Sequence, residues 1–183
     1  SKKNTRFLPS VASKFFKAKM YEYALEAYKL AKKDSNRAGY SIQVANIYSY
    51  LGEVDKMYEE LIMLLYEHPN YFQTCKNKLR ITISDNPENE NNNKLRKVLI
   101  KSIQKNNSYE ISKMLVWLFM QEKNFQAALD YEITIDKRIS NNTVDIVNLG
   151  EVASQNQHYS TAINCFEYVL KSNPKNSYYY EYS

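Results

Sequence analysis

Residues that form tight turns and reactive sites are scarce in this chain of 183 residues, which has 3 glycines, 4 prolines, 2 cysteines and 2 histidines. So little glycine and proline argues against a turn-rich β protein and leaves no glycine-rich loop to hold a phosphate group. Cys75 and Cys165 lie ninety positions apart and indicate no disulfide framework. Neither His68 nor His158 has neighbouring cysteines or carboxylates at the spacing of a zinc site. We therefore predict no metal, no cofactor and no catalytic residues, and we do not expect an enzyme.

Long apolar runs and a strong charge of one sign are also absent. No run approaches the roughly 20 residues that cross a bilayer, and no signal-peptide core is present. The chain has 25 Lys and Arg against 20 Asp and Glu, a formal net charge of +5 that does not by itself indicate nucleic acid. Tyrosine is abundant, with 17 residues, and hydrophobic residues make up 44% of the chain. This composition favours a helical protein whose half-buried positions are filled by tyrosine rings.

Four stretches of the chain carry small and large apolar residues at matching positions. The first stretch contains Val11, Ala12, Phe15, Ala24, Tyr28 and Ala31. The last contains Leu149, Gly150, Tyr159, Ala162, Phe166 and Pro174. Equivalent residues are Val11 and Val44, 33 positions apart, and Leu115 and Leu149, 34 positions apart. A regular period of this length indicates a stacked repeat whose units share one continuous core.

On these residues the chain resembles the tetratricopeptide repeat family, whose unit is a helix–turn–helix of 34 residues. The resemblance implies an all-α fold, a right-handed α-solenoid of about five antiparallel helix pairs forming one domain over residues 1–183. The small residues Ala12, Ala24, Gly150 and Ala162 are then expected where the two helices of a pair lie closest. The expected units span residues 5–37, 38–70, 71–108, 109–141 and 142–175.

The third unit, 71–108, is degenerate and is inferred from the length of chain between its neighbours. We expect its two helices at Tyr71–Ile83 and Lys94–Lys105, separated by a loop at Ser84–Asn93. Pro87 disfavours helix at the residue before it, and asparagine-rich segments favour turns. The polarity of this loop predicts a mobile excursion on the surface.

Residues 176–183 are expected to start a further first helix, with Tyr178 and Tyr180 on it. The chain would then belong to a longer solenoid, and self-association through these C-terminal tyrosines is an expected consequence. The composition is typical of a low-GC bacterium, and the repeat arrangement resembles repeat proteins of the Bacteroidetes group. That resemblance favours a periplasmic or cell-envelope location, although no residue in the sequence fixes the compartment.

The resemblance also implies which residues line a binding groove, because fixed positions of each first helix do so in the family. Carried over to this chain, the groove residues are Phe16, Lys17, Ile42, Asn46, Tyr50, Lys113, Trp117, Met120, Gln121, Val147 and Glu151. Trp117 is expected to be partly exposed there as an anchor for a peptide; the alternative is that it packs against a neighbouring helix. Ile42 replaces the lysine that would accompany Asn46 in a chaperone-type carboxylate clamp, so we do not expect that clamp.

The function that the resemblance implies is a non-catalytic scaffold that binds a peptide or a helix of another protein in this groove. The alternative is that basic helix faces bind an anionic polymer, either nucleic acid or an envelope polysaccharide. The residues concerned are Lys94, Arg96, Lys97, Lys101 and Lys105. Their spacing spreads them around the helix, and no aromatic residues lie between them to stack on bases. Nucleic acid is therefore the less favoured partner.

Overall fold

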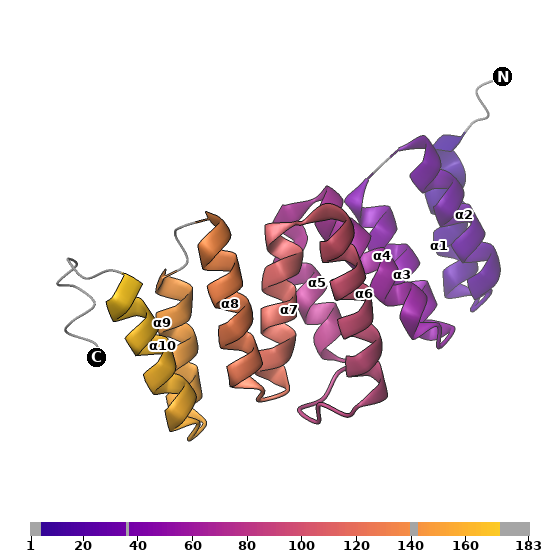
Figure 1. The fold of residues 1–183 in the computed structure, drawn as a ribbon. Helices are drawn as coiled ribbons and strands as arrows, with labels where there is room; N and C mark the ends of the chain where they lie inside the picture. The colour runs from indigo at the N-terminus through magenta and orange to yellow at the C-terminus, as the bar shows by residue number, and fades with distance from the viewer. Residues whose placement is uncertain (1–4, 36, 140–142, 173–183) are drawn as a thin grey trace.

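The structure, a computed structural model, describes residues 5–35, 37–139 and 143–172. Every regular element within these ranges is helical, and the helices stand side by side in one elongated row (Figure 1). Short 3₁₀ turns at Thr5–Phe7 and Pro69–Tyr71 precede the first and fifth α-helices. The α-helices are α1 Leu8–Lys17, α2 Tyr21–Asp34, α3 Ala38–Tyr50, α4 Val54–Glu67, α5 Phe72–Arg80, α6 Glu90–Asn106, α7 Tyr109–Gln121, α8 Phe125–Ile139, α9 Thr143–Gln155 and α10 Tyr159–Ser172. The predicted all-α solenoid of sequential helix pairs is confirmed.

The turn between the two helices has the same geometry in four of the pairs. Each of these turns has one residue with positive φ, at Lys19 (59°), Gly52 (74°), Lys123 (56°) and Gln157 (66°). At the first turn, the N–H groups of Lys19 and Met20 donate to the carbonyls of Phe16 and Phe15 at 3.0 and 2.9 Å, which ends the helix in a Schellman motif. Lys19 and Gly52 are 33 positions apart and Lys123 and Gln157 are 34 apart, which is the spacing of the sequence pattern, while 71 positions separate Gly52 from Lys123 across the degenerate unit. The turns therefore recur with the repeat of the sequence pattern in these four units.

The core follows the seams between the helices and is divided into two clusters. The larger cluster runs from α1 to α7 and the smaller from α7 to α10. The predicted small residues Ala12 and Ala24 are completely buried in the larger cluster. In the last pair, a Cβ added at Gly150 would lie 2.8 Å from Cε1 of Phe166 and 3.0 Å from Cβ of Cys165. The nearest neighbours of Gly150 on α10 thus lie about one turn beyond the predicted Ala162.

The loop of the third unit differs from the prediction: it occupies residues 81–89 rather than Ser84–Asn93. The reason is a helix cap. The side chain of Asn89 accepts hydrogen bonds from the N–H groups of Asn91 and Asn92 at 2.9 and 3.2 Å. Asparagine is among the best N-cap residues, so the second half of the asparagine run starts a helix instead of extending the loop.

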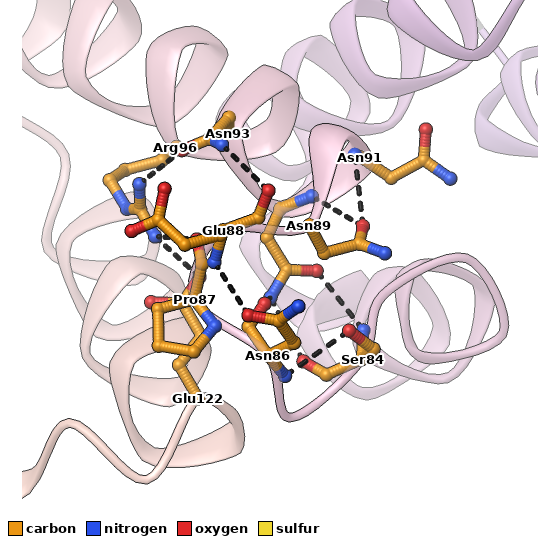
Figure 2. A network of polar contacts seen from close by, with 10 residues as sticks. Ser84, Asn86, Pro87, Glu88, Asn89, Asn91, Asn93, Arg96 and Glu122 are labelled. Carbon is orange, nitrogen blue, oxygen red and sulfur yellow. Dashed lines mark hydrogen bonds and ion pairs between the residues drawn. The ribbon is translucent and has the colours of Figure 1, made fainter.

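The loop lies on the surface as predicted, with residues 85–88 exposed, but hydrogen bonds fasten it to the fold and argue against the predicted mobility. Asn92 is completely buried and accepts from the N–H of Ser84 at 3.0 Å. Its amide donates to the carbonyls of Ser84 and Asn86 at 2.9 and 3.2 Å. Figure 2 shows Arg96 reaching from the start of α6 toward Glu122, to which it donates at 2.6 Å. In this unit α6 packs on α4 and α7, and the loop fixes the position where α6 begins.

Some predictions fall on residues that the structure does not describe. The expected further helix at 176–183, with Tyr178 and Tyr180, is one of them, as is the turn residue Pro174. These stay predictions, as does self-association through the C-terminal tyrosines. None of the helices in the described ranges is long and apolar enough to cross a membrane.

Candidate functional site

The predicted groove residues lie on α1, α3, α7 and α9, which with α5 are the first helices of the pairs. We call the side formed by these five helices the first-helix surface. A pocket of about 370 Å³ lies on it where α5, α7 and α9 meet. The four predicted groove residues of α7 line this pocket: Lys113, Trp117, Met120 and Gln121. The structure therefore brings the central part of the predicted groove together in one cavity.

The pocket also contains residues that the sequence pattern did not single out. They come from α5 and α9 and include Phe72, Lys76, Arg80, Asp145, Asn148 and Val152. α5 belongs to the degenerate unit, where the pattern is too weak to assign groove positions. On α9 the two predicted groove residues lie outside this pocket: Val147 packs against the smaller core cluster, and Glu151 is exposed.

Trp117 is a buried wall of the pocket rather than an exposed anchor. Only 7% of its surface is exposed, which contradicts the predicted partial exposure and favours the alternative of packing against a neighbouring helix. The Nζ of Lys76 on α5 lies 5.7 Å from its ring centroid, within reach of a cation–π interaction. Burial, and then the nearby charge of Arg80, lower the pKa of Lys76. The adjacent Met120 is only half-buried, so it offers the apolar surface that a ligand can reach.

A charged bridge frames the pocket and joins three helices. Lys113 on α7 donates to the carboxylate of Glu132 on α8, and to Oδ2 of Asp145 on α9 at 2.9 Å. Glu132 stands where the repeat pattern expects an aromatic residue, and it is 2% exposed. Burial acts to lower the pKa of Lys113, but hydrogen bonds and charge interactions with the two carboxylates raise it overall. Lys113 therefore stays charged at neutral pH and holds α8 and α9 on either side of α7.

Aromatic groove residues form a second group at the α1–α3 end of the first-helix surface. The ring of Tyr50 lies 5.2 Å from Phe16, edge to face, and stacks at 5.2 Å on Tyr21. Tyr50 is 63% exposed, so this cluster presents an aromatic face to solvent. The prediction named Phe16 and Tyr50 but missed Tyr21, which follows the turn at Lys19 and is brought back over α1 by it.

The other groove residues predicted at this end have separate environments. Lys17 is exposed, whereas Ile42 packs against the larger core cluster. Asn46 on α3 accepts a hydrogen bond from Nζ of Lys78 on α5 at 2.6 Å. This bond ties α3 to α5.

Side chains with nucleophilic or metal-binding potential are not assembled within the described residues. Cys75 and Cys165 are completely buried, and burial raises their pKa values to about 11 and about 12. The exposed ring of His158 packs edge to face on Phe125, with centroids 4.8 Å apart. In the described ranges no three His, Cys, Asp or Glu side chains gather where they could hold a metal ion.

No protein-family model matches the sequence, and no curated protein is similar to it. Solved tetratricopeptide repeat proteins are similar over nearly the whole chain. One from Thermus thermophilus is 14% identical, with 97% of this chain and 96% of that chain covered and a TM-score of 0.41. One from Parabacteroides merdae is 14% identical, with 97% and 70% covered and a TM-score of 0.43. YrrB, described as having an unusual peptide-binding site, is 15% identical, with 95% and 89% covered and a TM-score of 0.41.

Similarity at this level carries no argument about function. The fold rests on the chain itself: helix pairs joined by the same turn at 33- and 34-residue spacing form a tetratricopeptide-repeat-like solenoid.

Proposed function

We propose that this chain is a non-catalytic interaction module that holds a peptide or a helix of another protein on its first-helix surface. The observation that carries the proposal is the pocket between α5, α7 and α9, which combines apolar walls with two cationic side chains besides the bridged Lys113. Trp117 and Met120 supply apolar surface, and Lys76 and Arg80 lie beside them. Among the described residues neither cation takes part in an ion pair.

The chemistry of the pocket fits a ligand with an apolar side chain next to an acidic group. The apolar side chain would contact Met120 and the edge of Trp117, and the acid would pair with Lys76 and Arg80. Such a contact gains hydrophobic burial and charge complementarity together, and it requires little rearrangement because the bridge at Lys113 already holds α7, α8 and α9.

A binding role is supported over a catalytic one by the state of the reactive groups. The two thiols are buried and, with their raised pKa values, protonated at neutral pH, so neither is a ready nucleophile. A bacterial periplasmic or cell-envelope location remains a prediction from the sequence resemblance alone.

Peptide display tests this proposal. A random peptide library is selected on the chain, and enriched peptides are titrated while the emission of Trp117, the single tryptophan, is followed. We expect enriched peptides to carry an acidic residue near a large apolar one and to change this emission. Met120→Glu removes apolar surface and places a negative charge next to the acidic group of the peptide, so it should weaken binding about tenfold or more.

The matched control is Ile163→Glu, the same kind of change at an exposed apolar residue of α10. It should leave the affinity within about twofold, as expected for a surface site away from the contact. Failure to enrich any peptide, or equal affinity for wild type and Met120→Glu, would show that the pocket is not the binding site.

A further inference from the structure

A second groove lies on the other layer of helices, between α4 and α6, and it is independent of the first-helix surface. Its volume is about 230 Å³. All its lining residues come from these two second helices, which pack directly against each other. This groove exists because α6, at the degenerate unit, is packed on α4 as well as on α7.

The floor of the groove is apolar and reachable from solvent. Ile62 is buried, whereas Met63 and Tyr66 on the same helix are 43% and 45% exposed. Val98 on α6 is half-buried opposite them. Large apolar side chains that remain this exposed side by side are a mark of an interaction surface.

One edge of the groove carries a row of lysines. Lys97, Lys101 and Lys105 follow one another at four-residue spacing on α6, so they share one helix face, and all three are exposed. Lys101 and Lys105 line the groove itself. The prediction that the basic residues of this segment are spread around the helix therefore holds for the five together but not for these three.

The three lysines have no ion-pair partner among the described residues. The neighbouring cations differ: Lys94 pairs with Glu90 at 2.7 Å, and Arg96 pairs with the buried Glu122 at 2.6 Å. The row consequently keeps its positive charge available for a ligand.

We propose that the α4–α6 groove docks an amphipathic helix of a partner protein that carries acidic side chains along one edge of its apolar face. The lining residues of α4 run from Glu59 to Tyr66, so the groove is about 10 Å long, or two helical turns. Apolar residues at three- and four-residue spacing on the partner would lie on Met63 and Tyr66. Its acidic residues would pair with Lys101 and Lys105.

Other occupants fit these features less well. A nucleic acid would use the lysine row but would gain nothing from burying Met63 and Ile62 under phosphates. A second copy of this chain would bring the same lysine row and a net charge of +5 to the contact. An acidic amphipathic helix would both bury the apolar floor and pair with the lysines along the edge.

The test uses a synthetic fluorescein-labelled peptide of about 18 residues, long enough to hold a helix. Leucines recur at three- and four-residue spacing along it, and glutamates flank them. Anisotropy measures its affinity, and ¹³C-methyl methionine labelling locates it. We expect the peptide to shift the Met63 methyl signal in the wild type and equally in Met120→Glu, in which the other pocket is blocked.

Lys101→Glu/Lys105→Glu should weaken the peptide about tenfold or more, since two attractions become repulsions. The matched control, Lys33→Glu/Lys137→Glu, makes the same change of net charge at exposed lysines of α2 and α8 and should leave affinity within about twofold. Circular dichroism of both variants establishes that the helices are retained.

Three outcomes would overturn the proposal. One is equal affinity of the two double variants. Another is equal binding of a peptide whose leucines are replaced by alanine, since the apolar floor would then play no part. The third is that a single-stranded oligonucleotide shifts the Met63 methyl signal, binds more tightly than the peptide and displaces it. The groove would then be assigned to nucleic acid.

Discussion

At Gly150, α9 and α10 lie too close to leave room for a side chain. Alanine in place of glycine inside a helix normally stabilises it by about 1 kcal/mol. Here the added Cβ would lie 2.8 Å from a ring carbon of Phe166 and 3.0 Å from Cβ of Cys165. Because Cys165 is buried and cannot move aside freely, we expect Gly150→Ala to destabilise the fold by about 1–2 kcal/mol, measured by urea unfolding.

Gly39→Ala provides the comparison, since Gly39 lies in α3 and a Cβ there would have nothing within 4 Å. That variant should be neutral or more stable by a few tenths of a kcal/mol, up to about 1. A gain in stability from both substitutions would mean that the close approach of α9 and α10 is wrong.

Lys113 is the residue whose loss should disturb the pocket most. Lys113→Met removes the cation that the buried Glu132 faces, and breaking a buried pair in this way costs on the order of 3 kcal/mol. Lys113→Met combined with Glu132→Leu should recover much of that loss, because no charge is then left at the buried position. Chemical denaturation of the three proteins at pH 7 measures the difference.

The bridge also predicts a pH dependence with a definite sign. The pKa of Lys113 is raised above its ordinary value of 10.5 by its two carboxylates, against the opposing effect of burial. A raised pKa contributes stability that is complete below 10.5 and is lost as the pH rises through the folded-state pKa. The stability gap between wild type and Lys113→Met should therefore be constant near neutrality and shrink above pH 10.5. A gap that grows with alkaline pH would contradict this assignment.

At the scale of single elements, the loop before α6 depends on one buried side chain. Asn92 makes three hydrogen bonds to the backbone of Ser84 and Asn86. Asn92→Ala would leave those buried groups without partners, and we expect a loss of about 2–3 kcal/mol by thermal or urea unfolding. Gln104→Ala, at an exposed position of the same helix, should change stability by less than about 0.5 kcal/mol. Equal effects of the two would imply that the loop is not held by Asn92.

Helix register could be predicted from the sequence because small residues and turns recur with the repeat. Lys19, Lys123 and Gln157 have positive φ although none of them is glycine. The chain turns at these residues because the packing of the helices on both sides favours it. The loop boundary could not be predicted in the same way. Asparagine favours both loops and helix N-caps, and only the packing of Asn92 decides between these roles.

The pocket was predictable only where the repeat pattern is clear. The four residues on α7 were found because α7 begins a well-matched unit, whereas Lys76 and Arg80 lie on α5, where the pattern has decayed. The burial of Trp117 depends on how closely α5 approaches α7, which a single helix pattern does not contain. A lysine at 113 with a glutamate at 132, a core position, was the one available signal for the bridge.

At the scale of the whole molecule, the course of unfolding depends more on how the core is divided than on its total size. Apart from α6, which packs on α4 and α7, the helices contact mainly their sequence neighbours, as in other repeat arrays, so the stability of one end is only loosely coupled to that of the other. The larger cluster joins α1 to α7 and the smaller one joins α7 to α10, with α7 shared. Unfolding is then expected to proceed in blocks rather than in one step.

The two cysteines report on the two clusters separately, since Cys75 lies in the larger and Cys165 in the smaller. Both are completely buried, and their pKa values are raised to about 11 and about 12, so a thiol reagent should modify neither in the native protein at pH 8. With increasing urea, the smaller cluster should open first because it buries less apolar surface. The single-cysteine variants Cys75→Ala and Cys165→Ala allow each labelling rate to be followed alone.

We expect Cys165 to become reactive at a lower urea concentration than Cys75, while the far-ultraviolet circular dichroism still shows much of the helix content. The stability of the two variants without reagent must be compared, because each replacement removes a buried sulfur and costs about 1 kcal/mol. If both thiols instead became reactive together, at the midpoint of the global transition, α7 would couple the clusters tightly and the solenoid would unfold as one unit.

A ligand bound between α5, α7 and α9 contacts helices of both clusters. Binding there should therefore raise the urea concentration at which Cys165 reacts, toward the concentration at which Cys75 reacts.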